Sequence, residues 1–150
     1  MKKTIIIILS GILVALYVSL VSCGIRKKAS NPMLIEGTWR IAKVDGQEVS
    51  IDKEDLLTIS FDLTEKRFGG TGYCNSFGAE FTLTEKGDFS VGPILSTRMA
   101  CPGLGSESAI FKALEESKRI VVRGNKALIY DNADAKNAPR LVLIRKKNVA

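Results

Sequence analysis

Apolar and polar residues alternate along much of the chain, and this alternation predicts a series of half-buried strands. Over residues 57–64, Leu, Ile, Phe and Leu occupy every second position, with Thr, Ser and Asp between them. Such a period of two places one face of a strand in the core and the other in solvent. The same pattern returns at 79–84. Further strands are indicated by shorter apolar runs at 37–41, 89–91, 120–122, 127–130 and 141–144.

The period changes from two to that of a helix only after residue 105. Ser106 is a good N-cap, Glu107 is favourably placed in the first helical turn, and Lys118 and Arg119 would close the helix where cations are favoured. The apolar stripe consists of Ile110, Phe111 and Leu114. The sequence therefore predicts an α+β fold, an antiparallel barrel-like sheet of about eight short strands with one helix packed across it.

Two tight-turn signals interrupt the strands. Asp45-Gly46 predicts a two-residue hairpin turn, because Gly accepts the positive φ that such a turn requires. The glycine-dense stretch 69–75 lacks the G-K-[ST] of a phosphate-binding loop and no helix signal follows it. We interpret it as a kinked or bulged strand, at a place where the barrel bends or two backbones come close.

The N-terminus has the order of parts of a secretory signal. Lys2 and Lys3 precede an apolar run over 5–21, and Leu20-Val21-Ser22-Cys23-Gly24 resembles the lipobox of bacterial lipoproteins. This resemblance implies a signal peptide over 1–22, cleavage before Cys23, and a lipid on the Cys23 thiol that attaches the protein to a membrane. We expect a tether over 23–36 and one domain over 37–147. The alternative is an uncleaved anchor, for which 17 apolar residues are at the short limit.

By analogy with the sorting rule of enteric bacteria, Gly24 after the Cys implies an outer-membrane lipoprotein. Whether the domain faces the periplasm or the outside stays open. The charge balance argues against nucleic-acid binding. The chain has 22 Lys and Arg against 16 Asp and Glu, but eight of the basic residues lie in the flanks. The remainder is close to neutral, so nucleic acid is not an expected partner.

The residue types present exclude much catalytic chemistry. The chain contains no histidine, which excludes His-based acid–base catalysis and the common His-containing zinc sites. Three cysteines are too few for a metal site built from four thiolates. We therefore expect no catalytic residues, no metal and no cofactor, and a protein that is not an enzyme.

Once Cys23 carries the lipid, Cys74 and Cys101 remain as a pair. In an oxidising compartment an even pair normally forms a bridge. Closing the 26-residue loop between them is worth about 3.5 kcal/mol in the chain-entropy model. The alternative is a redox-active pair, although redox motifs usually have a spacing as short as C-x-x-C.

Two local patterns together resemble the META/HslJ family of small bacterial envelope domains. They are Gly72-Tyr73-Cys74-Asn75-Ser76-Phe77-Gly78 and Ser96-Thr97-Arg98-Met99-Ala100-Cys101. The resemblance covers about 34–145 and implies an antiparallel barrel-like domain, a stress association in some members, and no established enzymatic activity. Its motif residues here are Cys74, Asn75, Arg98, Met99 and Cys101.

These motif positions are interpreted as mainly structural. Asn75 is expected to bond its own turn backbone. Arg98 is expected to satisfy loop carbonyls or pair with a carboxylate, with an anion or partner contact as the alternative.

The leading hypothesis is a non-catalytic, lipid-anchored envelope protein with a binding or stress-related role and an unknown ligand. The second is a carrier or pilot-like lipoprotein that shelters an apolar ligand or a partner peptide in the barrel. A thiol–disulfide enzyme using Cys74 and Cys101 ranks below both. A secreted hydrolase inhibitor is also compatible with a small bridged barrel.

Overall fold

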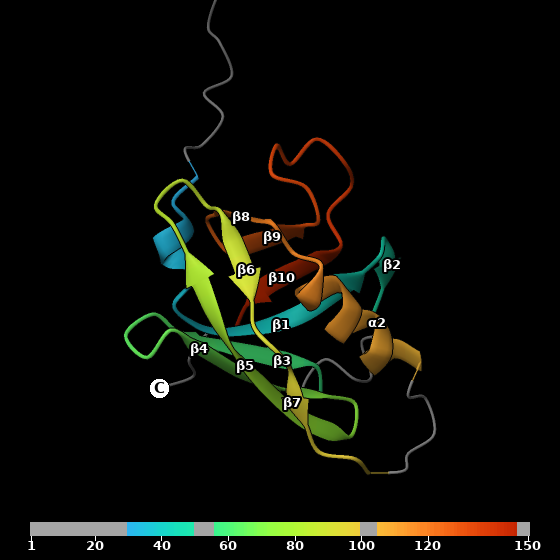
Figure 1. Ribbon diagram of the computed structural model, residues 1–150. Coiled ribbons are helices and arrows are strands. Elements are labelled where there is room, and N and C mark those ends of the chain that lie inside the picture. Colours follow the sequence, from blue (N-terminus) through green and yellow to red (C-terminus); the bar gives the residue numbers. More distant parts are fainter. Residues whose placement is uncertain (1–29, 50–55, 100–104, 147–150) are drawn as a thin grey trace, which may run out of the picture.

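The computed structural model describes residues 30–49, 56–99 and 105–146 (Figure 1). Strands are the main elements of these described residues, which also contain one α-helix and one short 3-10 helix. The elements in chain order are η1 (Pro32–Ile35), β1 (Gly37–Val44), β2 (Gln47–Glu48), β3 (Thr58–Asp62), β4 (Arg67–Gly72), β5 (Asn75–Leu83), β6 (Phe89–Val91), β7 (Leu95–Ser96), α2 (Gly105–Glu115), β8 (Arg119–Arg123), β9 (Lys126–Tyr130) and β10 (Leu141–Arg145).

The strands form one antiparallel sheet that curls until its two edges nearly meet. Its order is β6-β5-β4-β3-β1-β10-β9-β8, with the short strands β2 and β7 paired to β1 and β5. The edges meet at a seam, where Asp88 forms an isolated bridge with Arg119. There the Phe89 N–H donates to the Lys118 carbonyl at 3.0 Å, and the Arg119 guanidinium pairs with the Asp88 carboxylate at 3.1 Å. The predicted α+β, barrel-like fold is confirmed.

The inner face of the barrel is filled by side chains. Alternation along β3 points Ile59 and Phe61 inward, as predicted, and leaves Ser60 outside. Six phenylalanine rings contact one another there, with centroids 5.1 to 6.3 Å apart: Phe61, Phe68, Phe77, Phe81, Phe89 and Phe111. Such packing accounts for much of the stability of a small domain. The described interior gives the carrier hypothesis no support.

The helix lies across one end of the barrel and ends earlier than its charges suggested. Ile110 and Leu114 are fully buried and Phe111 packs half-buried against the core, which confirms the predicted apolar stripe. However, Lys118 lies beyond α2 and Arg119 opens β8, so the prediction that they close the helix is wrong. The chain leaves the helix because the Ser117 hydroxyl donates to the Leu114 carbonyl at 2.5 Å and the Lys118 N–H donates to Tyr130. Ser106 lies within the helix and not before it.

The glycines of β4 and β5 allow neighbouring backbones to come close. A Cβ on Gly70 would lie 2.2 Å from the Thr58 carbonyl oxygen, and one on Gly78 would lie 2.9 Å from that of Phe68. The close-backbone interpretation is confirmed. The bulge is not, because β4 pairs in regular register with both neighbours. The register shift lies in β1, between Ile41 and Lys43.

The antiparallel strands give the barrel two different ends. The motif end carries the 45–46 and 73–74 turns, the loop after β9, and α2, to the right in Figure 1. The tether end carries η1, the β8–β9 turn and the end of β10, to the left. The Asp45-Gly46 turn has positive φ at both residues, as predicted.

The tether end is held by Trp39 and Arg145. Trp39 is fully buried and its Nε1–H donates to the Ile35 carbonyl at 2.6 Å. The Arg145 guanidinium lies 4.2 Å from the centre of the Trp39 ring and donates to the Glu36 carbonyl at 2.8 Å. Arg145, one of the eight basic residues that were predicted to lie in the flanks, is therefore part of the packed domain. In the described chain, no helix has both the length and the apolar character needed to cross a membrane.

Replacing Gly70 by Ala is expected to destabilise the domain by about 3 kcal/mol, because the added methyl group meets the Thr58 carbonyl and the Phe77 ring. Gly69→Ala is the matched control: its Cβ would meet only the Phe77 carbonyl oxygen, at an ordinary 3.7 Å. Urea unfolding of both variants measures the difference. Equal midpoints would show that the backbones do not approach as described.

Candidate functional site

The family-motif segments meet at the motif end around a buried carboxylate. Glu107, on the first turn of α2, is only 3% exposed, and Asn75, at the start of β5, is 4% exposed. Glu107 Oε1 accepts the backbone N–H groups of Cys74 at 3.0 Å and Asn75 at 2.9 Å. The Asn75 side-chain Nδ2 donates to Glu107 Oε2 at 2.7 Å. Both carboxylate oxygens are thus bonded to the β4–β5 turn.

The other half of the Asn75 amide binds the second motif segment. Asn75 Oδ1 accepts the Thr97 hydroxyl at 3.0 Å and the Met99 N–H at 2.7 Å. Thr97 also accepts the Ser76 N–H at 3.1 Å. The prediction that Asn75 bonds its own turn is therefore wrong, because its side chain reaches two distant segments instead. We call Asn75, Thr97, Met99 and Glu107 the amide–carboxylate cluster.

Glu107 is ionised in this setting despite its burial. Burial itself opposes the charged form, but the hydrogen bonds from the Asn75 side chain and from the Asn75 and Cys74 N–H groups lower the pKa of Glu107 below its ordinary value. The sequence placed Glu107 correctly in the first helical turn but missed this role. Its turn position also puts it at the positive end of the helix dipole.

Gly72 and Tyr73 shape the turn that Glu107 holds. A Cβ on Gly72 would lie 3.1 Å from Glu107 Cγ, so glycine gives the carboxylate room to approach. Tyr73 has φ +28°, in the left-handed region that residues with side chains rarely adopt. The Cys74 N–H also donates to the Gly72 carbonyl within the turn. The buried carboxylate stabilises this turn by accepting the N–H groups that follow it.

The remaining predicted site residues divide between the surface and undescribed segments. Arg98 and Met99 are exposed, and no carboxylate of the described chain lies within ion-pair distance of Arg98. Cys74 lies in the turn, half-buried, whereas Cys101 and the predicted lipid site Cys23 fall outside the described residues. The Cys74–Cys101 bridge and the lipid on Cys23 stay predictions.

Next to the cluster, the outer surface carries an exposed leucine between two shallow hollows. Leu95 of β7 is 77% exposed. One hollow, of about 400 Å³, runs from Leu95 and Pro93 over Gly78 to Arg67. The other, of about 300 Å³, lies between Leu95, Ser76 and Thr97. Leu95, Arg98 and Met99 are exposed within one five-residue segment, which we call the Leu95 surface.

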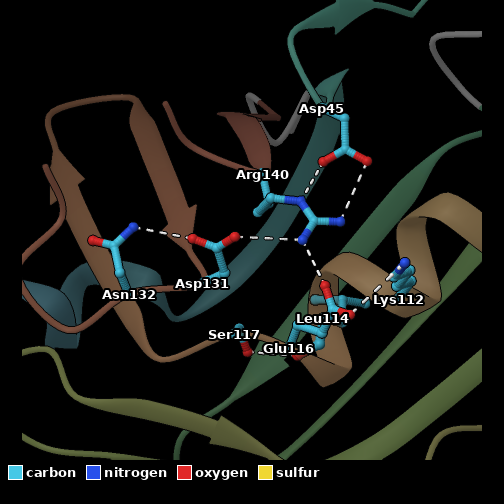
Figure 2. A network of polar contacts seen from close by, with 8 residues as sticks. All are labelled: Asp45, Lys112, Leu114, Glu116, Ser117, Asp131, Asn132 and Arg140. Atoms are coloured by element: carbon cyan, nitrogen blue, oxygen red, sulfur yellow. Dashed lines mark hydrogen bonds and ion pairs between the residues drawn. The ribbon is translucent and has the colours of Figure 1, made fainter. Parts of the chain in front are cut away.

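A second polar network at the motif end fastens the helix C-terminus. Figure 2 shows the Arg140 guanidinium between three carboxylates. It donates to Asp45, to Glu116 at 2.6 Å and to Asp131 at 3.5 Å. Hydrogen bonds from Asp45 and then Glu116 raise the pKa of Arg140. This network joins the 45–46 turn, α2 and the loop before β10, and all its charges are engaged with each other.

Metal-binding groups are not gathered anywhere in the described ranges. No group of three or more Cys, Asp or Glu side chains there has the spacing to hold a metal ion. The clusters around Glu107 and Arg140 are internal networks of hydrogen bonds and ion pairs.

The chain matches the model of a known protein family. The family model described as the META domain matches residues 32–147. The chain belongs to the META domain family. The match begins at η1, whose Ile35 is fully buried in the core of this META domain. The amide–carboxylate cluster is the structure that joins its two motif segments.

One solved structure with a similar fold is the NMR structure of a protein from Burkholderia xenovorans. The two chains are 20% identical and superpose with a TM-score of 0.59, covering 84% of this chain and 95% of the other. This likeness concerns the fold alone. No curated protein matches the sequence.

Glu107→Gln is expected to destabilise the META domain by about 2 kcal/mol, although Gln has the same shape as Glu. One of its two terminal atoms becomes a donor and faces the donor Asn75 Nδ2, which leaves buried polar groups unpaired. In the double variant Asn75→Asp/Glu107→Gln the donor and acceptor roles are exchanged, so the bond between the two side chains reforms and much of the loss is recovered. Urea unfolding of the single and double variants measures this coupling.

Glu115→Gln is the matched control, since Glu115 is exposed on the same helix.

The ionised Glu107 also predicts that the stability of the domain depends on pH. Its pKa is lower folded than unfolded, so its contribution is complete above the unfolded value of about 4.5 and is lost as the pH falls through the lower folded value. Glu107→Gln therefore reduces the loss of stability at acid pH. A double variant as unstable as the single one would contradict the proposed bonding.

Proposed function

We propose that the protein is a non-catalytic, lipid-anchored envelope protein of the META type that binds a protein partner through the Leu95 surface. The observation that carries this proposal is that the polar groups of the amide–carboxylate cluster are used within the domain. Both ends of the Asn75 amide and both oxygens of Glu107 are bonded within the domain. This internal use of the cluster's polar groups supports a scaffolding role for it, as does the absence of histidine from the chain.

The anchor is supported by the sequence. The Leu20-Val21-Ser22-Cys23-Gly24 segment follows a basic and an apolar region in the order of a lipoprotein signal. Gly24 favours the outer membrane. The same export places Cys74 and Cys101 in oxidising surroundings, which supports a bridge between the turn and the segment before α2.

The binding role is supported by what the Leu95 surface exposes. Leu95 and Met99 are the two most exposed large apolar side chains of the described chain, and Arg98 lies between them in sequence. Exposed apolar residues beside a cation suit a protein segment with apolar and acidic side chains. The cluster fixes this surface, because the Met99 N–H and the Thr97 hydroxyl are both bonded to Asn75.

Intact-mass analysis of the mature protein tests the anchor and the bridge together. We expect a chain that begins at Cys23, carries acyl groups, and is lighter by two hydrogens than its reduced form. Cys23→Ser should abolish the acyl mass while the bridge remains. A mature chain that retains Met1 and an unmodified Cys23 thiol would refute the anchor.

Photo-crosslinking in cells tests the binding role. Benzoylphenylalanine in place of Leu95 is expected to give a discrete protein adduct, and Arg98→Glu should weaken it several-fold by removing the cation that pairs with the partner. The same photoprobe in place of Thr82, an exposed strand residue away from the Leu95 surface, is the control. Equal, diffuse labelling from both positions would argue against a partner at Leu95.

A further inference from the structure

The tether end of the barrel carries exposed basic and apolar side chains side by side. Arg123 and Lys126 are register partners that flank the β8–β9 turn, and both are exposed. Neither lies within ion-pair distance of a carboxylate in the described chain. On η1, Met33 is 38% and Leu34 is 50% exposed, although Pro32 and Ile35 of the same turn are buried.

Backbone and side-chain contacts unite these residues into one surface. The Asn31 N–H donates to the Val122 carbonyl at 3.3 Å, which places η1 beside the end of β8. The Arg145 guanidinium donates to the Leu34 carbonyl, while the Arg145 N–H donates to Asn125 in the β8–β9 turn at 2.9 Å. We call Met33, Leu34, Arg123 and Lys126 the tether-end surface.

The length of the tether limits how far this surface can lie from an anchor at Cys23. Seven residue steps separate Cys23 from Ser30, where the described domain begins. A fully extended chain of that length spans about 24 Å, and a relaxed one spans less. The tether sequence also contains Arg26, Lys27 and Lys28. Because the Ser30 hydroxyl accepts the Val122 N–H at 3.2 Å, the end of the domain closest to the anchor is the end that carries Arg123 and Lys126.

Glu36, Glu85 and Asp134 also lie near this surface, and two of these carboxylates have partners within the domain. The Glu36 carboxylate accepts the Leu63 N–H at 2.7 Å. Glu85 and Asp134 line a polar hollow that also includes Arg123 and Ser30, and Asp134 pairs with Lys136 at 2.8 Å. Together with Arg26, Lys27 and Lys28 of the tether, the basic residues Arg123 and Lys126 outnumber these three carboxylates.

We propose that the tether-end surface docks on the anionic headgroups of the bilayer that holds the anchor. This inference rests on the proposed lipid on Cys23. Arg123 and Lys126 contact lipid phosphates, while Leu34 and Met33 enter the interfacial layer. The barrel then stands on its tether end, with the Leu95 surface directed away from the membrane.

The test uses the mature lipidated chain in vesicles, with benzoylphenylalanine in place of Leu34 in one sample and in place of Leu95 in the other. In vesicles of phosphatidylcholine with phosphatidylglycerol, the Leu34 position is expected to crosslink to lipid, whereas the more exposed Leu95 position is not. Arg123→Glu/Lys126→Glu should lower the Leu34–lipid adduct on the order of tenfold, since each basic contact with an anionic surface is lost. Pure phosphatidylcholine should lower it similarly.

Failure of docking is distinguishable from failure of the anchor. If the chain floats with the vesicles but both positions label lipid equally, or Leu34 crosslinks to another protein chain, the docking proposal is overturned. If the chain does not float at all, the anchor fails instead, and the docking geometry fails with it. Unchanged urea midpoints for the charge-reversal variant show that the domain stays folded.

Discussion

The hydrogen bonds between Asn75 and Glu107 are the contact on which the motif end depends. A carboxylate buried beside the end of a barrel is costly to desolvate, and the cost is offset only if its oxygens meet donors. Here three N–H donors converge on Glu107, and the opposite end of the same Asn75 amide takes two more. The helix, the β4–β5 turn and the segment after β7 are held by one pair of side chains, so a change in either partner affects all three.

Much of the fold follows from local patterns in the sequence. The alternation at 57–64 predicts β3 because an inward Ile59 and Phe61 leave only one favourable register. The apolar stripe on α2 likewise follows directly from the spacing of its apolar residues. The helix end was predicted wrongly because Lys118 and Arg119 suit a helix terminus, yet backbone bonds of Lys118 to Tyr130 and to Phe89 draw the chain into the seam. Such bonds depend on strands that lie far apart in the sequence.

Only part of the candidate site could be predicted from the sequence, because its bonds also join residues that lie far apart in the chain. Asn75 and the Thr97–Met99 segment stand out as motif residues, but the carboxylate that Asn75 binds is 32 residues away on α2. A Glu in the first turn of a helix is common, and nothing local distinguishes an exposed one from one that is buried. Glu107 is identified only when the tertiary fold brings three segments together. Arg98 is the opposite case: it stands out as a motif residue in the sequence, yet it lies at the surface next to the cluster.

The place of β1 in the sheet constrains when the domain can form. Of the described strands β1 is the first along the chain, yet it lies between β3 and β10, the last of them. Trp39 is covered by Arg145, more than a hundred residues later, so the hydrophobic face of the first strand stays uncovered until synthesis has produced the final one. Long-range closure of this kind slows folding. The export proposed above, through a translocation pore in an extended state, would gain from this delay, because the barrel cannot close while β10 is still being made.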